Sequence, residues 1–259
     1  MLPRPVLVVS IELTVVLLGL FAIAVLYSSV GHGGGSGYLA VLSMTSFASA
    51  QAIWLKQYAW SLNLIVAALA FWHYSKEGHH DMRLSLPFIL ASVPLAVLGG
   101  YMLVEGSLYD LLLSVALVTA AWRLLTGDAG IGKTTRPDTS AAVAVGGSIG
   151  LASGVIGIGG GIFLSPFLML KGWATAKEAA ATSALFIWLN SLAGLAGAGL
   201  SGRLDIDMGL LLPFSLAVLL GGLIGSRYGS QVSSQTGIRG LLVVVLIVAA
   251  ARRVIGGEL

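Results

Sequence analysis

Two glycine-rich runs stand inside apolar parts of the sequence. One reads VGHGGGSG over residues 30–37, and the other reads IGIGGG over residues 156–161. Consecutive glycines end a helix, and the helix that follows begins with unpaired N–H groups at the positive end of its dipole. An anion is the ligand that such a helix start prefers. The runs therefore predict an anion site inside a membrane, with close helix packing and no ligand as the alternative.

Polar side chains within apolar segments are further candidates for ligand binding. Lys56 lies in AIWLKQY, where an ammonium costs about 2.5–3.5 kcal/mol at the membrane centre, unless its stem carries it to the surface. Asn63 and Asn190 interrupt long apolar runs, where they line a site or hydrogen-bond between helices. The residues predicted to bind a substrate are Gly31, His32, Gly33, Gly34, Gly35, Ser36, Lys56, Gln57, Asn63, Gly157, Gly159, Gly160, Gly161, Thr182, Ser183 and Asn190.

His32 and Ser36 in the first run suggest two other chemistries. A histidine can exchange a proton near neutral pH, so His32 either couples transport to protons or is only a polar lining residue. Residues 34–37 resemble the G-x-S-G motif of rhomboid intramembrane proteases. Such an enzyme needs a histidine on a second helix as its base, and His32 is too close in sequence for that. An intramembrane serine hydrolase using Ser36 stays open as an alternative function.

Two further motifs match enzymes in their letters only. GDAGIGKT at 127–134 fits the Walker A pattern with Lys133, but an apolar helix precedes it where a strand is required, and Pro137 prevents a helix after it. Residues 146–150 fit G-x-S-x-G but lie within an apolar helix rather than at a strand-to-helix turn. We therefore expect no enzyme, with no catalytic residue, no metal and no cofactor.

The composition indicates a membrane protein. Of 259 residues, 57% are hydrophobic and 10% are charged, against about 25% charged in soluble domains. The absence of cysteine excludes disulfides, thiol catalysis and cysteine-bound zinc. A net charge of +3, from 14 basic and 11 acidic residues, is too small for a nucleic-acid surface. We expect an all-α, polytopic transmembrane helical bundle in a lipid bilayer.

Helices that cross the membrane must position these residues, and one crossing needs about 20 apolar residues. The candidate helices are 13–30, 37–47, 50–73, 85–104, 107–125, 141–156, 162–171, 175–199, 207–228 and 237–255. Segments 37–47 and 162–171 are too short to cross alone, and each follows a glycine run. The helices are thus expected to break at the glycines.

The sequence on one side of the polar stretch 126–140 resembles the sequence on the other side. At an offset of 126 residues, glycines of the first run fall on glycines of the second, and the triplet LPF at 86–88 falls on LPF at 212–214. Such a duplication is common in secondary transporters. We expect a first transmembrane repeat at 1–125, a cytoplasmic linker at 126–140 and a second repeat at 141–259, which makes the first helix a retained one rather than a signal peptide.

Two arrangements of the short helices fit the sequence. If each continues the crossing of the helix before it, the chain crosses eight times. If each turns back, the chain crosses ten times and the two repeats are inverted. Lys and Arg divide 9 to 5 in both cases, and the richer side, which holds the linker, is cytoplasmic by the positive-inside rule. The charges do not choose between the two arrangements.

Together these features resemble the TauE/SafE family of sulfite and organosulfonate exporters. The resemblance rests on the two glycine motifs, VGHGGGSGYLAVLSM and SGVIGIGGGIFLSPFLMLKGWATAKEAAATSALFIWLNSLAG, and on the organisation in two halves. It covers nearly the whole chain. The first half differs from the plainer family pattern at His32, Ser36, Lys56 and Gln57.

The resemblance implies a multi-pass carrier of the bacterial inner membrane that uses no ATP. Its substrate would be a small inorganic or organosulfur anion, such as sulfite, sulfoacetate or thiosulfate, exported or exchanged by alternating access. Coupling to protons and a homodimer stay open. A membrane scaffold that transports nothing is the other alternative, although a scaffold has no need of polar residues at mid-membrane.

Overall fold

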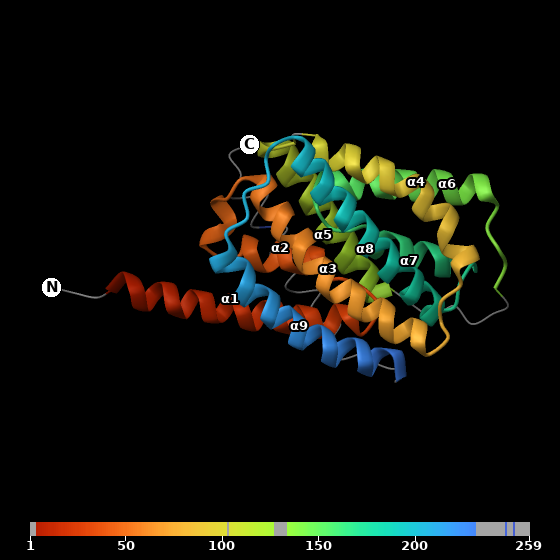
Figure 1. The fold of residues 1–259 in the computed structure, drawn as a ribbon, viewed down its shortest axis with the longest axis horizontal. Helices are drawn as coiled ribbons and strands as arrows, with labels where there is room; N and C mark the ends of the chain where they lie inside the picture. The colour runs from red at the N-terminus through yellow and green to blue at the C-terminus, as the bar shows by residue number, and fades with distance from the viewer. Residues whose placement is uncertain (1–3, 103, 127–133, 232–246, 248–250, 252–259) are drawn as a thin grey trace.

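The computed structural model describes residues 4–102, 104–126, 134–231, 247 and 251. Within these ranges the chain is helical and has no strand, which confirms the expected all-α class (Figure 1). The elements are α1 (Arg4–Ser28), α2 (Gly35–Ser43), the short 3-10 helix η1 (Ser46–Ser49), α3 (Ala52–Lys76), α4 (Met82–Tyr101), α5 (Gly106–Thr126), α6 (Thr139–Ile156), α7 (Gly161–Leu170), α8 (Ala176–Leu200) and α9 (Met208–Gln231).

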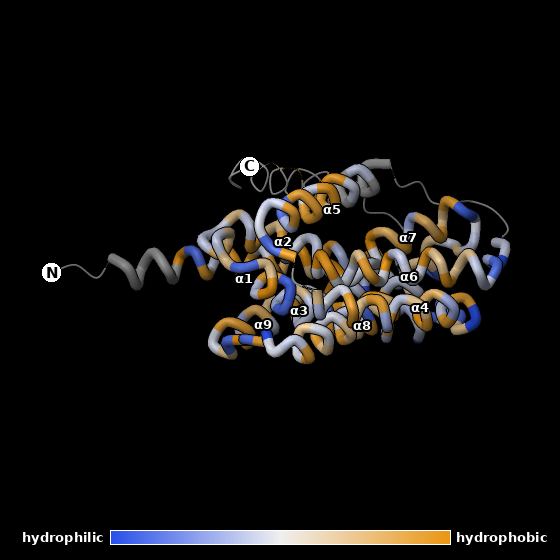
Figure 2. Tube along the Cα trace, turned by 90° about the horizontal axis from the view of Figure 1, so that it is seen from above, coloured by the Kyte–Doolittle hydropathy of each residue, from blue (hydrophilic) through white to orange (hydrophobic). Residues whose placement is uncertain are grey.

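The helices suit a bilayer rather than water. Within the described part of the chain, five of them are long and apolar enough to cross a membrane, namely α1, α4, α6, α8 and α9. Large apolar side chains such as Leu18, Leu90 and Leu200 are 63%, 65% and 73% exposed on the outside of the bundle. Hydrophilic segments gather mainly at its two ends (Figure 2). Because lipid is the medium that stabilises such a surface, the chain is a multi-pass membrane protein.

Polar contacts define the two ends of the bundle. At the first, which we call the linker end, the N–H of Thr135 donates to the carbonyl of Gly172 over 2.8 Å. At the opposite end, which we call the far end, Arg203 donates to the carbonyl of Tyr101 over 3.4 Å. Side chains can therefore be placed along the bundle by the end that they adjoin.

Both short helices turn back. The N–H of Ser46, after α2, donates to Glu12 near the start of α1 over 2.6 Å, so α2 returns to the end from which α1 came. Gly172, after α7, likewise meets Thr135, which precedes α6. The described residues thus have the second of the two arrangements: α1 runs toward the linker end and α6 away from it (Figure 1). If the halves are repeats, they are inverted.

Glycines bring α4 against α6, and α9 against α1, at close range. A Cβ built at Gly99 would lie 2.6 Å from the carbonyl oxygen of Leu151, and one at Gly225 would collide with the carbonyl of Val25. The two pairs correspond at an offset of 126 residues, because Gly99 corresponds to Gly225 and Val25 corresponds to Leu151. Helix α3 packs along α8, while α4 also contacts α8 and α9 also contacts α3. Each half thus packs against the other in the same manner, as a duplication predicts, although the duplication itself stays a prediction.

Nine of the ten predicted segments are α1 to α9, in order. Their ends differ from the prediction by a few residues, except that α1 begins at Arg4 rather than at 13. The tenth segment, 237–255, lies almost wholly outside the described residues.

Candidate functional site

The two glycine runs meet at the Asn63 side chain of α3. A Cβ built at Gly33 would lie 2.6 Å from Asn63 Oδ1, and one at Gly35 or Gly159 would lie 2.8 Å from Asn63 Nδ2. Any side chain at these positions would displace the amide. Glycine therefore allows two segments of main chain, one from each half, to reach one buried side chain. We call this place the glycine crossing.

Left-handed backbone sets the direction in which α2 and α7 leave the glycine crossing. Gly34, with φ +104°, directly precedes α2, and Gly160, with φ +84°, directly precedes α7. That conformation costs other L residues about 1–2 kcal/mol. Because α2 runs to the far end and α7 to the linker end, the positive ends of both dipoles point toward the crossing from opposite sides.

Buried polar atoms around the crossing lack hydrogen-bond partners within the described residues. They are Asn63 Oδ1, Ser153 Oγ and Ser183 Oγ. Both amide atoms of Asn190, seven residues after Ser183 on α8, are likewise buried without a described partner. A Cβ at Gly161 would lie 3.4 Å from Ser183 Cβ, and one at Gly160 would lie 3.3 Å from Ser153 Cβ, so both serines adjoin the second loop. Buried polar groups are seldom left unsatisfied, so this cluster indicates a place for a polar ligand or water.

His32 joins the first loop to α7. Its Nε2 lies 3.1 Å from the carbonyl oxygen of Gly161, and its Nδ1 lies 3.0 Å from that of Val30. A neutral imidazole carries one N–H and can donate to only one of them, whereas an imidazolium can donate to both. The contact with Gly161 connects the two halves, so the protonation state of His32 bears on how they are joined.

Ser36 pairs with a tyrosine rather than with a histidine. Its Oγ lies 2.9 Å from the hydroxyl of Tyr27, while both ring nitrogens of His32 face carbonyl oxygens. The contacts of the described residues thus give Ser36 no general base, which a serine nucleophile requires. They provide no support for the hydrolase alternative.

Lys56 lies on the far-end side of the crossing and does not reach the surface. Its side chain is 1% exposed, and its Nζ lies 6.0 Å from the ring centroid of Trp60 and 5.7 Å from that of Tyr109. A Cβ built at Gly157 would lie 2.6 Å from Lys56 Cγ, so the second loop packs along the lysine stem. The alternative in which Lys56 extends to the surface is therefore wrong.

Gln57 and Thr182 lie away from the crossing. The N–H of Asp205 donates to Gln57 Oε1 over 3.0 Å, and Gln57 Nε2 donates to the carbonyl of the same residue, so the amide is occupied by the loop before α9. The Thr182 hydroxyl accepts from Ser85 Oγ over 3.3 Å. Both side chains thus join helices to neighbouring elements, and neither belongs to the site that we propose below.

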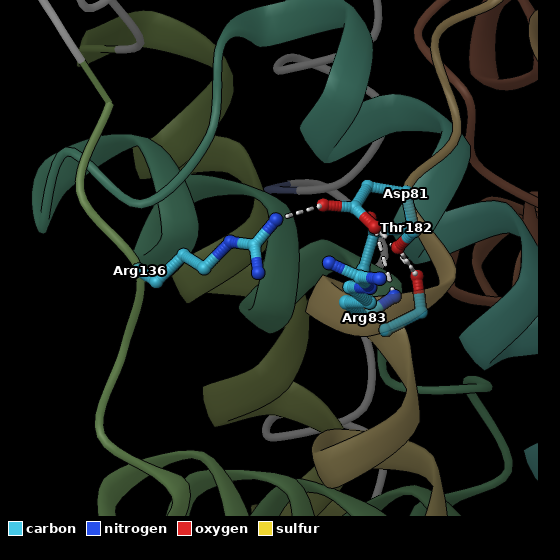
Figure 3. A network of polar contacts seen from close by, with 5 residues as sticks. Asp81, Arg83, Arg136 and Thr182 are labelled. Carbon is cyan, nitrogen blue, oxygen red and sulfur yellow. Dashed lines mark hydrogen bonds and ion pairs between the residues drawn. The ribbon is translucent and has the colours of Figure 1, made fainter.

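Asp81 organises the linker end close to Thr182 (Figure 3). It caps α4 by accepting from the N–H of Arg83 over 2.8 Å, and it pairs with Arg136 of the linker at 3.4 Å. Burial lowers the pKa of His80, an effect that the nearby Asp81 carboxylate partly opposes. This cluster holds the linker against the helices.

Sequence reasoning missed two hydroxyls of the site. Ser191 accepts from Asn63 Nδ2 over 3.2 Å, and Ser153 adjoins Gly160. Ser191 stands eight residues after Ser183 with Ile187 between them, a spacing that keeps all three near one side of α8. That spacing was a usable signal, whereas Ser153 is one of many small residues in α6 and carries none.

Comparison with known proteins decides the family. The pattern described as "Sulfite exporter TauE/SafE" matches residues 15–253. The chain belongs to the TauE/SafE family. It is 35% identical over 240 residues to "Probable membrane transporter protein y4hK" of Sinorhizobium fredii, which covers 90% of this chain and 94% of that protein. It is 25% identical over 196 residues to "Probable membrane transporter protein YunE" of Bacillus subtilis, with 68% and 70% covered. No solved structure matches the chain.

Membership of the TauE/SafE family confirms the resemblance inferred from the glycine motifs. The family is one of membrane transporters, and the glycine crossing, Lys56 and His32 all lie within the matched residues. The chain is accordingly a membrane transporter of the TauE/SafE type.

Proposed function

We propose that the chain is a secondary carrier that exports or exchanges a small sulfur-containing anion, such as sulfite, sulfoacetate or thiosulfate, across a bacterial inner membrane. One observation carries the proposal: two helix starts from different halves point at one buried polar cluster. Positive helix ends directed at a mid-membrane site are a recurring way to hold an anionic group without a charged side chain. The description of the family as sulfite exporters supports sulfur oxyanions as the class.

In this proposal the anion accepts from N–H groups at the starts of α2 and α7 and from polar side chains at the crossing. Asn63 can turn its amide, because the Ser191 hydroxyl both donates and accepts and can serve either amide atom. Its N–H₂ group then faces the anion. Asn190 and Ser183 supply further donors. Neutral donors replace hydration without binding so tightly that release is prevented.

Transport by this site requires the halves to move. Asn63, Ser183 and Asn190 are all 0% exposed, so in this structure the crossing is closed toward both faces. We infer alternating access by rocking of one half against the other, at the glycine-lined contacts of α4 with α6 and of α1 with α9. Such contacts between backbones can slide without repacking large side chains.

Protons are the coupling ion that we propose, with His32 as their site. Protonation allows both ring nitrogens to donate and places a positive charge beside the crossing, where it offsets the charge of the anion. Loss of the proton leaves His32 with one N–H for two carbonyl oxygens, so one of its hydrogen bonds to Val30 and Gly161 is lost and the two halves are held together less firmly. Binding of the anion and the proton then favour each other.

The charges at the two ends support a cytoplasmic linker end. Lysines and arginines with described side chains gather there, whereas two lie toward the far end. Those at the linker end are Lys76, Arg83, Arg136, Lys171, Lys177 and Arg227, and those toward the far end are Lys56 and Arg203. The positive-inside rule then places the far end outside.

Counterflow in proteoliposomes tests the proposal. Vesicles holding the purified chain would be loaded with sulfite, sulfoacetate, thiosulfate, sulfate or acetate, and entry of a labelled sulfur anion would be followed. We expect exchange with one or two of the sulfur anions and none with acetate. An imposed pH gradient should drive net uptake in the wild type but not in His32→Gln. Protein-free vesicles are the control, and no exchange with any anion would refute the carrier and leave the scaffold alternative.

A further inference from the structure

Lys56 is a buried cation that makes no ion pair with the described residues. Among the residues whose side chains the structure describes, the one ion pair joins Arg136 to Asp81, so the ammonium of Lys56 makes none. It is 1% exposed and faces the rings of Trp60 and Tyr109. Burying an unpaired charge is unfavourable, and two aromatic faces offset only part of that cost.

In the part of the chain that the structure describes, a second donor near Lys56 also lacks a hydrogen-bond partner. Trp60 Nε1 is buried without a hydrogen bond, one helical turn further along α3. The C-terminal end of α6 lies beside Lys56, and there the carbonyl of Ile156 accepts from the Tyr109 hydroxyl over 3.2 Å. A buried ammonium and a buried indole N–H, both without acceptors among the described residues, are matched by a ligand that only accepts hydrogen bonds, which is an anion.

These donors form one line with the glycine crossing. Lys56, Trp60 and Asn63 stand at i, i+4 and i+7 of α3, which places them on one face. Seven residues of helix correspond to about 10 Å along its axis. The second glycine loop follows the same face, because Gly157 packs against Lys56 and Gly159 against Asn63. The line therefore leads from the crossing toward the far end.

The charged groups around Lys56 leave its ammonium available to an anion. Glu105 and Arg203 are the charged groups that act on it most strongly, and their effects have opposite sign. Glu105 is exposed, so water screens its attraction to Lys56. The position corresponding to Lys56 in the second half is the neutral Thr182, which is occupied by Ser85. The cation thus stands on one side of the crossing only.

We propose that Lys56, with Trp60, forms a second anion-binding station between the glycine crossing and the far end, which the transported anion occupies on its way across. This inference rests on the proposed function and adds direction to it. With the far end outside, an exported anion passes from neutral donors at the crossing to a cation near the exit. The station also captures external anions when the carrier exchanges one anion for another.

Lys56→Met tests the station because it keeps the length of the side chain and removes the charge. We expect the concentration of external sulfite that half-saturates counterflow to rise about tenfold or more, as for loss of a charged hydrogen bond. The half-saturating concentration at the linker end should stay nearly unchanged, which vesicles of the two orientations can measure. Trp60→Phe keeps an aromatic ring and removes the N–H, and should raise the external value about threefold.

Lys177→Met is the matched control, because it makes the same substitution at the linker end, where Lys177 donates to the carbonyl of Ser230 over 3.0 Å. It should leave the external half-saturating concentration unchanged. Equal values for wild type, Lys56→Met and Trp60→Phe would overturn the station, as would an equal rise at both faces. If Lys56→Met fails to fold, as judged by size-exclusion chromatography, the decision rests on Trp60→Phe. If sulfite is not among the anions that the wild type exchanges, the same comparison is made with the sulfur anion that is. Absence of exchange with every sulfur anion in the wild type would instead refute the proposed function.

Discussion

The two glycine loops share left-handed backbone at two corresponding pairs of positions, Gly31 with Gly157 and Gly34 with Gly160, whereas Gly159 is left-handed and its counterpart Gly33 is not. Their side-chain contacts differ more. Each has left-handed glycines before a short helix, namely Gly34 before α2 and Gly160 before α7. The first loop adds hydrogen bonds from side chains, because the Tyr38 hydroxyl donates to the carbonyl of Gly33 over 2.7 Å and His32 faces the carbonyl of Gly161. The second loop instead packs against Lys56 and Phe186, while both loops contact Ile187.

This difference between the loops separates the features that bind the anion from the residues that control its transport. Both halves supply the features that any anion needs, which are a break in a helix and unpaired N–H groups. Among the described residues, only the first half places a titratable ring and a cation beside the crossing, namely His32 and Lys56. We infer that the shared backbone makes the site, whereas His32 and Lys56 set its coupling and its direction. The variants below test whether the two loops contribute equally to the anion site and unequally to coupling and direction.

The largest effect is expected from a side chain at the left-handed positions. In Gly34→Val and Gly160→Val, the backbone strain of about 1–2 kcal/mol adds to collisions 2.6 Å from the Tyr38 ring and 2.9 Å from the Phe186 ring. Both variants should lose counterflow about equally, by at least about tenfold, because each displaces one helix start. Membrane insertion, measured by yield in washed membranes, should persist.

Gly172→Val is the control for those variants. Gly172 has φ +64° with nothing within 4 Å of a built Cβ, so it carries the backbone strain without the collision. It should transport normally. Normal transport by both loop variants would show that the crossing is not the site, and loss in only one of them would show that the two loops are not equivalent.

An intermediate effect should distinguish Gly31 from Gly157. A Cβ at Gly31 would lie 2.5 Å from the Cα of Ala180, whereas one at Gly157 first meets the Cγ of Lys56 at 2.6 Å. A lysine stem can bend and a helix backbone cannot, so Gly31→Ala should lose about 2–4 kcal/mol of unfolding free energy and Gly157→Ala about 1–2 kcal/mol. Unfolding of the purified variants in detergent measures this.

A second substitution checks the cause of that difference. Lys56→Ala should restore part of the stability of Gly157→Ala but none of that of Gly31→Ala. Equal losses in the two single variants would mean that the left-handed backbone, rather than the neighbour, decides the cost.

The smallest effect concerns the helix caps. Asp81 caps α4 through the N–H of Arg83, and Asp207 accepts from the N–H of Gly209 at the start of α9 over 2.7 Å. Asp81→Ala and Asp207→Ala should each cost about 1 kcal/mol, while Arg136→Ala should cost well under about 1 kcal/mol, because the pair that it breaks is exposed. All three should transport normally. A clearly larger loss for Asp207→Ala would show that the two ends are not matched.

The sequence was sufficient to predict the helices and their breaks at the glycine runs. Apolar length and glycine position determine where a membrane helix can form and where it must break. The sequence was not sufficient to decide whether the short helices α2 and α7 continue the preceding crossing or turn back. A short apolar segment has the same composition in either direction. The direction depends on left-handed glycines such as Gly34 and on distant contacts such as Ser46 with Glu12.

The same reasoning applies to side chains whose partners lie on distant elements. Gln57 was grouped with Lys56 because the two are adjacent and polar, yet neighbouring residues on a helix point in different directions. Gln57 faces a loop that begins after Leu200, a contact that no local pattern reveals. Ser191 was overlooked because a serine in an apolar helix commonly bonds its own backbone, and its partner Asn63 lies on a different helix.

The packing of α4 bears on how the chain is made. Its closest neighbours are α6 and α8, which leave the ribosome after it, and Gly99 and Gly100 face the backbone of α6 and α8 in the finished protein. Lipid tails fill such a glycine seam poorly, so α4 reaches its final contacts only once the second half is in the membrane. A truncated product would keep this seam exposed to lipid, where the cell's quality control can distinguish it from a completed chain.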